Sequence, residues 1–229
     1  MRWLRRRQNE VERGEAHVGR ERDVYALMRT AAGNDLEGWE QIRDGAWTRP
    51  LADGIRALIR LGAMKGMTYQ LYWGLSLAWV PHLTSTGTSL HRTAKSARLD
   101  LFEEGQFHDA RVSFEWGGGG TVIWLAEDLE RAWRIGFELA NAFFARATGP
   151  EAVLTLAEEQ MEDGWAMTVH MPGPVYVATF TLAQLGREAE ARAMLDRQLQ
   201  KWYLHPDAPQ VREHAGEKLE RALERTLKA

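Results

Sequence analysis

The stretch TYQLYWGLSLAWV, from Thr68 to Val80, alternates large apolar residues with smaller ones. The large residues occupy the odd positions: Tyr69, Leu71, Trp73, Leu75, Leu77 and Trp79. Because successive side chains of a strand point to opposite faces, this period of two predicts a β-strand with one face in a core. Pro81 is predicted to end the strand, since proline cannot donate to a sheet ladder.

Further strands are predicted at Ala97–Phe102, Ala110–Trp116 and Thr121–Leu125, where β-branched and aromatic residues lie between turn-like sequences. The connections between these segments are too short for crossover helices, so neighbouring strands should run antiparallel. The sequence therefore predicts an antiparallel sheet of about four or more strands at the centre of the molecule.

Four consecutive glycines, Gly117–Gly120, separate the last two predicted strands. A phosphate-binding loop needs a helix directly after its glycines, so that backbone N–H groups point at the anion. Here Thr121–Leu125 follows and is typical of a strand, and no lysine follows the glycines. We therefore favour a mobile hairpin turn over a flap that covers a ligand, and both over a phosphate site.

Helical periods flank the predicted sheet. Residues 1–31 combine charges with apolar residues near heptad spacing, which predicts a charged N-terminal helix. A second helix is predicted from about Pro50, with an apolar stripe of Leu51, Ile55, Leu58, Ile59 and Leu61. The helical period returns at residues 127–144, and another helix should follow Pro150. Helices around an antiparallel sheet make an α+β fold.

The C-terminal tail has the spacing of a helical hairpin. Its characteristic residues are Ala178, Leu182, Ala183, Leu185, Gly186, Glu190, Ala191, Ala193 and Leu195. This pattern resembles one tetratricopeptide repeat (TPR), and HPDAP at His205–Pro209 lies where such repeats commonly end. Because solenoids normally need about three repeats, a single hairpin should pack on the main domain. With Gly164–Pro174 as the seam, we predict an α+β domain over 1–165 and a TPR-like hairpin over 174–229.

The composition of the 229 residues is that of an ordinary globular protein, with 45% hydrophobic and 27% charged residues. The absence of cysteine excludes disulfides, thiolate metal sites and cysteine nucleophiles. No apolar run is long enough to cross a membrane, and no apolar segment of a signal peptide follows the basic N-terminus. We therefore expect a cytoplasmic protein that does not bind membranes.

A net charge of -3 gives no overall attraction to nucleic acid. The basic run Arg5–Arg7 is followed by the acidic residues Glu10, Glu12, Glu15 and Glu21. Their opposite charges favour a solvated helix over a nucleic-acid-binding surface.

The segment HRTAKSARLDLF, His91–Phe102, is the densest polar part of the middle region. Its cations His91, Arg92, Lys95 and Arg98 could line an anion-binding groove beside the sheet. The alternative is an edge strand that charge protects from aggregation. These four cations are our candidate ligand-binding residues.

Three histidines lie in the same region: His82, His91 and His108, with Asp100, Asp109 and Glu115 near them in sequence. None has HxxxH, HxH or HExxH spacing, so ordinary loop histidines are favoured over a metal or acid–base site. There is no GxSxG motif for a serine nucleophile. We assign no catalytic residue and expect no cofactor.

Ten tryptophans is a large number for this length. Trp73 and Trp79 share one strand face and are expected in the core, because tryptophan buries a large area. The alternative is an exposed aromatic cleft for a ligand or partner, and for this reason both join the candidate ligand-binding residues.

The order of a helix, WGLSLAWVPH, LHRTAKSARLDL, a hairpin and further helices resembles bacterial α+β proteins of unknown function, some associated with immunity and defence. The leading hypothesis is a non-enzymatic protein-interaction module, immunity-like or regulatory, that uses the aromatic and charged sheet face or the helical hairpin. The alternative is a small-molecule or anion-binding protein, with enzymatic activity left open, whose polar pocket lies beside the sheet.

Overall fold

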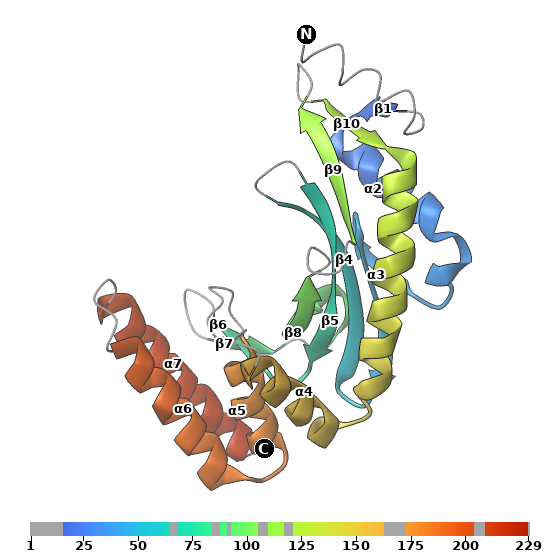
Figure 1. Cartoon of the computed structure of the whole chain (residues 1–229). Coiled ribbons are helices and arrows are strands. Elements are labelled where there is room, and N and C mark those ends of the chain that lie inside the picture. Colours follow the sequence, from blue (N-terminus) through green and yellow to red (C-terminus); the bar gives the residue numbers. More distant parts are fainter. Residues whose placement is uncertain are drawn as a thin grey trace. The chain divides into compact units, whose positions relative to one another are not determined.

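The structure is a computed structural model, and it describes residues 16–64, 68–83, 88–90, 93–104, 110–116, 121–162, 173–203 and 209–228. Antiparallel strands fill much of the first half of this chain and helices fill the second half (Figure 1). The predicted α+β class is confirmed. The glycines Gly117–Gly120 and most of the predicted seam, residues 164–172, lie outside the described residues.

The described strands form one large sheet and one small ladder. The large sheet has eight strands in the order β1-β10-β9-β5-β4-β3-β2, and β8 also pairs with β5. Its strands are β1 (Ala16–Gly19), β2 (Glu40–Arg43), β3 (Ala46–Ala52), β4 (Ile55–Met64), β5 (Thr68–Leu77), β8 (Leu101–Glu104), β9 (Arg111–Trp116) and β10 (Val122–Leu125). The strands β6 (Pro81–Leu83) and β7 (Thr88–Leu90) pair separately.

The structure describes one helix in the first half of the chain and five in the second half, and those five follow the predicted order. The described helices are α2 (Glu21–Ala32), α3 (Ala126–Arg146), α4 (Pro150–Glu162), α5 (Pro174–Gln184), α6 (Glu188–Tyr203) and α7 (Pro209–Leu227). Two short 3-10 helices are η1 (Gly33–Leu36) and η2 (Ala94–Ser96).

The alternation in β5 is confirmed. Its odd residues from Tyr69 to Leu77 are all almost completely buried. The strand ends at Leu77, however, and Pro81 begins β6 instead of ending β5. The strands β9 and β10 pair antiparallel, with Trp116 opposite Val122, as the hairpin interpretation of the glycine run requires.

The helix predicted from Pro50 is wrong, because this segment forms β3 and β4 around a turn at Asp53 and Gly54. Gly54 has a φ of 70°, a conformation that suits glycine in a tight hairpin. Ile55, Ile59 and Leu61 are buried, and so is Leu58 between them. A strand buried on both faces lacks alternation, so its apolar spacing also fits a helix.

Two other predicted elements are shorter than expected. The N-terminal helix, predicted over residues 1–31, begins only at Glu21 within the described chain, because Ala16–Gly19 pairs with β10 as strand β1. The strand predicted at Ala97–Phe102 begins at Leu101, and a 3-10 turn precedes it. Pairing with distant strands decides both outcomes, and local spacing does not report it.

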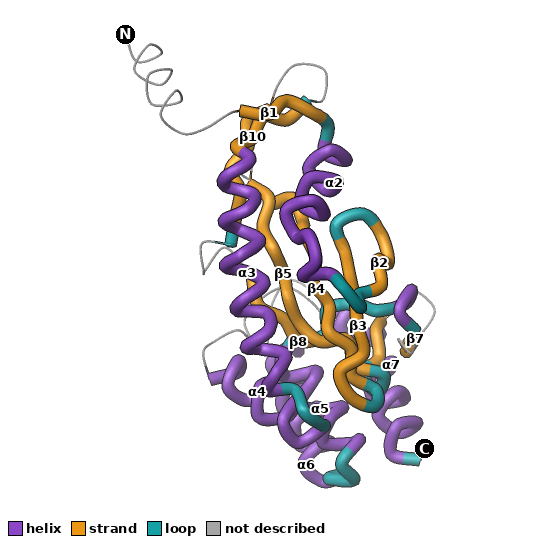
Figure 2. Tube along the Cα trace, turned by 90° about the vertical axis from the view of Figure 1, so that its right-hand side faces the viewer, coloured by secondary structure: helices purple, strands orange, loops and turns teal. Residues whose placement is uncertain are grey.

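The chain divides into two compact units, and the first contains residues 1–49, 58–73 and 102–142. In this unit α2 and α3 lie over β4 and β5 (Figure 2). A Cβ atom on Gly136 of α3 would lie 2.6 Å from Cδ1 of Leu71 and 3.2 Å from Cβ of Ala110. The glycine therefore allows α3 to approach the sheet closely.

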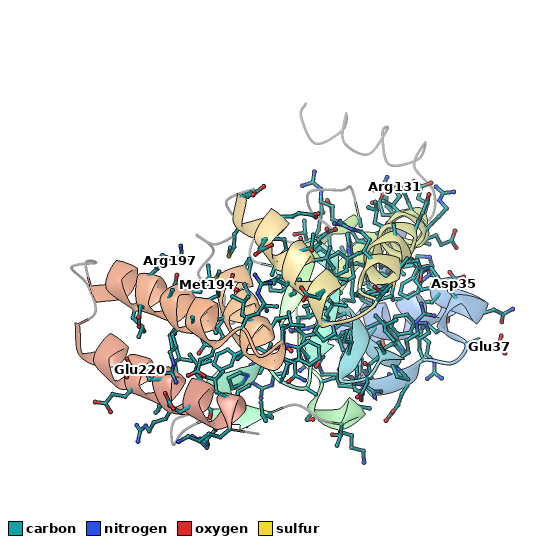
Figure 3. The ribbon with its side chains drawn as sticks, turned by 90° about the horizontal axis from the view of Figure 1, so that it is seen from below. Asp35, Glu37, Arg131, Met194, Arg197 and Glu220 are labelled. Atoms are coloured by element: carbon teal, nitrogen blue, oxygen red, sulfur yellow. The ribbon has the colours of Figure 1, made fainter. Side chains whose placement is uncertain are left out.

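The second unit contains residues 50–57, 74–101 and 143–229. Each of its helices α4 to α7 packs against the next, and α7 also contacts α5, β6 and β7 (Figure 1). α5 is buried along nearly its whole length, whereas Arg197 of α6 and Glu220 of α7 are exposed (Figure 3). Gly186, with a φ of 73°, forms the turn between α5 and α6. The predicted hairpin is present, while its likeness to a tetratricopeptide repeat stays a prediction.

Candidate functional site

The two candidate tryptophans are core side chains. In the first unit, Trp73 is fully buried and its Nε1–H donates to Oε2 of Glu103 at 3.0 Å. In the second unit, Trp79 is 7% exposed and its Nε1–H donates to Oγ1 of Thr181 at 3.1 Å. Burial with a satisfied indole N–H is what the core interpretation predicts. Neither ring lines an exposed aromatic cleft in this structure.

Of the four candidate cations, His91 and Arg92 lie outside the described residues, and both Lys95 and Arg98 are exposed. Lys95 is part of η2, which Thr93 caps by accepting a hydrogen bond from the backbone N–H of Ser96 at 3.3 Å. The segment around Lys95 is therefore a short 3-10 turn instead of the edge strand that was the alternative. Lys95 and Arg98 therefore lie on a segment whose backbone forms hydrogen bonds with Thr93 and Ser76.

Asp100 fixes the end of this segment to the sheet. Its backbone N–H donates to the carbonyl of Leu75 at 2.8 Å, and its Oδ2 accepts from the N–H of Leu77 at 2.7 Å. Its Oδ1 lies 2.6 Å from Nε2 of His82 on β6, and the backbone N–H of Arg98 donates to Oγ of Ser76 at 3.1 Å. These bonds join β5, β6 and the Arg98–Asp100 segment at one point.

The environment of Asp100 decides its protonation. Its side chain is fully buried, and this desolvation raises its pKa above the ordinary value. The hydrogen bond from His82, the charge of His82, the bond from Leu77 and the charge of Arg98 each act in the opposite direction. Desolvation is the largest of these effects. Because both partners of the pair are buried, its geometry fits a structural joint better than an acid–base catalyst.

Of the histidine and carboxylate residues considered from the sequence, the structure brings together His82 and Asp100. His91, His108 and Asp109 lie outside the described residues, and Glu115 is an exposed residue of β9. Among the described residues, no group of three or more histidine, aspartate or glutamate side chains could hold a metal ion.

The first unit has an exposed sheet surface that the sequence-based site did not include. The register places Val18 opposite Ile123 and Ile123 opposite Glu115 on three neighbouring strands. It also places Ser113 opposite Thr68 and Arg111 opposite Gln70. Paired residues of antiparallel strands share a face, so these side chains form one surface.

This surface continues across β5 onto β4. Tyr72 lies on the same face of β5 as Gln70, and a Cβ on Gly62 would be 3.0 Å from its ring. Arg60 shares the face of Gly62, and the Phe102 ring lies 6.2 Å from that of Tyr72. We call this surface the outer sheet face and define it by these residues: Val18, Arg60, Tyr72, Phe102, Arg111, Ser113, Glu115 and Ile123.

The outer sheet face is more exposed than the opposite one, although Gln70, opposite Arg111, is buried. Arg60, Arg111, Ser113 and Glu115 are exposed, and Val18 has 66% of its area exposed. The residues between them on the same strands, such as Val112, Phe114 and Trp124, are buried on the side of α3. The outer sheet face therefore combines arginine, tyrosine and aliphatic side chains with charges of both signs. The alternation of Arg111, Ser113 and Glu115 was a sequence signal for it.

No family model, no curated protein and no solved structure matches the chain. Among the helices that the structure describes, none has both the length and the apolar character needed to cross a membrane.

Proposed function

We propose that this chain is a non-enzymatic protein-interaction module of a bacterial cytoplasmic protein, regulatory or immunity-like, and that its partner binds the outer sheet face. One observation carries the proposal: consecutive strands of the first unit present an exposed face that mixes aromatic, aliphatic and arginine side chains. Protein interfaces are enriched in tyrosine and arginine and have a polar rim around an apolar centre.

The distribution of side chains supports a protein partner. Tyr72 and Phe102 contact each other and are half-buried, so their remaining exposed area is held in place. Half-buried aromatic side chains contribute binding energy at low cost in conformational entropy. Val18 and Ile123 add apolar area at the β1 and β10 end of the same face.

The charges on the outer sheet face support a protein over a nucleic acid. Arg60 and Arg111 are accompanied by Glu115 on the same face. A phosphate-binding surface needs a net positive field, and a carboxylate within it weakens that field. Mixed charges instead favour a partner with complementary charges of both signs.

Capture from a lysate of the native cells tests the proposal when wild type and variants are compared. Val18→Asp with Arg111→Glu alters two exposed side chains of the outer sheet face. Arg134→Glu, on the exposed side of α3, changes the charge by the same amount as Arg111→Glu and is the control for that half of the double variant. The proposal predicts a stoichiometric partner that wild type and control retain and the double variant loses. A partner that all three proteins retain would place the interface elsewhere.

Anion binding beside the sheet is the second candidate function. The exposed cations Lys95 and Arg98 flank backbone that η2 and Asp100 hold in place, which favours a defined position for their charges. A ligand at about 100 times its dissociation constant adds roughly 2.7 kcal/mol of stability. Thermal shifts with phosphates, nucleotides and sugars test this, and Arg98→Gln should remove a specific shift. If no ligand raises the melting temperature, this candidate fails.

A further inference from the structure

On the side of the first unit that faces α3, the contacts change from aromatic to polar along β3. The rings of Trp47 on β3 and Trp133 on α3 lie 5.9 Å apart, and Trp133 stacks on Phe137 at 5.3 Å. Two residues beyond Trp47, and so on the same face of the strand, lies Arg49. One helical turn beyond Phe137 lies Asn141. The next pair of residues along β3 and α3 is therefore Arg49 and Asn141, which contact each other.

The guanidinium of Arg49 is held on two sides. Its Nη2–H donates to Oδ1 of Asn141 at 3.2 Å. Its central carbon lies 4.7 Å from the centroid of the Trp39 ring, and that ring lies 6.4 Å from Phe137. A cation over a tryptophan face is electrostatically favourable, and the planar contact restricts the side chain. Arg49 is thus fixed before any ligand arrives.

The positive charge of Arg49 has no counter-charge in the described part of the chain. No described carboxylate lies within ion-pair distance of its guanidinium, and its buried Nε–H has no acceptor. Asp35, labelled in Figure 3 on the segment after α2, accepts instead from Nε1–H of Trp133 at 2.8 Å. A half-buried charge without an ionic partner is costly, and a negative ligand would offset that cost.

We propose that Arg49, Asn141 and Trp39 form a binding site for the carboxylate of a small organic acid. Because guanidinium only donates, the oxygen of Asn141 points at Arg49 and its NH₂ group is left to donate. One positive charge with neutral donors beside it matches a singly charged carboxylate better than a doubly charged phosphate. Trp39 adds an aromatic surface, so an aromatic acid should bind better than acetate.

This site is independent of the proposed partner surface. Arg49 contacts α3, whereas the outer sheet face lies on the opposite side of the strands. If the carboxylate site does not bind benzoate, the proposal that the outer sheet face binds a partner still stands. If no partner binds the outer sheet face, the proposed carboxylate site still stands.

An NMR titration of the full chain tests the site with benzoate as the probe. The Arg49 Nε–H resonance is assigned by its loss in Arg49→Lys. Benzoate should shift this resonance and the Trp39 indole resonance saturably, and phosphate or chloride at equal ionic strength should not. In Arg49→Lys the affinity should fall about tenfold or more, because lysine lacks the planar fork. Absence of a saturable shift, or an equal shift with chloride, would overturn the proposal.

Asn141→Asp supplies a variant that does not depend on removing a side chain. It places a carboxylate beside Arg49 at nearly unchanged volume, so the chain should fold with an equal or higher melting temperature and lose its response to benzoate. Arg134→Lys, exposed on α3, should respond like wild type. Benzoate binding by Asn141→Asp at wild-type affinity would overturn the site. Tighter binding of a peptide C-terminal carboxylate than of benzoate would overturn the assignment to a small acid.

Discussion

The two faces of the sheet in the first unit are built from the same strands and differ in exposure and in charge. Towards α3, Tyr69, Leu71 and Phe114 are almost completely buried. On the outer sheet face, the alternate residues Arg111, Ser113 and Glu115 are exposed. Because residues one apart point to opposite sides, substitutions at neighbouring positions should have opposite consequences. The buried set determines stability, and the exposed set is available for a partner.

The largest loss of stability is expected for Trp133→Ala on the covered side. Trp133 contacts Trp47 and Phe137, and its indole N–H donates to Asp35. Removing a buried aromatic side chain costs about 3–5 kcal/mol in the free energy of unfolding. Urea denaturation measures this loss. Trp133→Phe should cost less, since it keeps an aromatic ring, and an equal loss in both variants would contradict the packing assigned to Trp133.

Asp100→Ala extends the comparison to a buried polar group of the second unit. The substitution leaves the N–H of Leu77 without its side-chain acceptor and removes one partner of His82. A buried donor left unsatisfied costs about 1–3 kcal/mol. Asp100→Asn should cost less, because its oxygen can accept from Leu77 and its amide can donate to Nε2 of the other histidine tautomer. Equal destabilisation by both variants in urea would contradict the stabilising role assigned to the hydrogen bonds of Asp100.

A comparison of wild type with Asp100→Asn tests the pKa of Asp100. Burial raises its pKa in the folded state above the unfolded value, so the folded state binds the proton more tightly. The resulting stabilisation is present below the unfolded pKa and is lost as the pH rises through the folded pKa. As the pH rises through the folded pKa, the free energy of unfolding of wild type should therefore fall relative to that of Asp100→Asn. A difference independent of pH, from denaturation at a series of pH values, would contradict the raised pKa.

Two glycines provide a matched test of the faces with a smaller expected effect. On the covered side, Gly136→Ala places a Cβ 2.6 Å from the buried Leu71 and should cost about 1–3 kcal/mol. On the outer sheet face, the Cβ of Gly62→Ala would lie 3.0 Å from the half-buried ring of Tyr72, which can move. Melting temperatures should therefore fall clearly only for Gly136→Ala. The reverse order would mean that the outer sheet face is the more tightly packed.

The smallest change in stability is expected for Val18→Asp with Arg111→Glu. Both side chains are exposed, and surface substitutions usually change the free energy of unfolding by no more than about 0.5 kcal/mol each. Circular dichroism melting should give nearly the wild-type midpoint, while capture of the partner is lost. A large fall in the midpoint would show that these residues support the fold, and the loss of capture would then carry no information on binding.

The sequence predicted those elements whose spacing has one interpretation. The alternation from Tyr69 to Leu77 correctly predicted a strand, although Gln70, Gly74 and Ser76 on its other face are also buried, and the stripe along residues 127–144 correctly predicted a helix. From Ile55 to Leu61, apolar residues occur on both faces of the strand, so helical spacing fitted equally well and gave the wrong element. Pairing with β10 turned Ala16–Gly19 into a strand, and nothing local to that segment indicates this partner.

The candidate sites were harder to predict than the elements. His82 and Asp100 are 18 residues apart and meet only because β6 and the Arg98–Asp100 segment return to the end of β5. Arg49 and Asn141 are 92 residues apart, and neither belongs to a recognisable motif. The outer sheet face was partly readable from the alternation of Arg111, Ser113 and Glu115, but the register that unites it with Val18 and Ile123 required the fold.

The most direct test of the outer sheet face is site-specific photo-crosslinking in the native cells. A photoreactive amino acid replaces Ser113, at the centre of the outer sheet face, or Arg134, on the exposed side of α3. The proposed function predicts one discrete crosslinked protein from position 113 and none from position 134. Crosslinking from position 134 alone, or from neither position in cells that make the protein, would contradict the claim that the outer sheet face binds a protein partner.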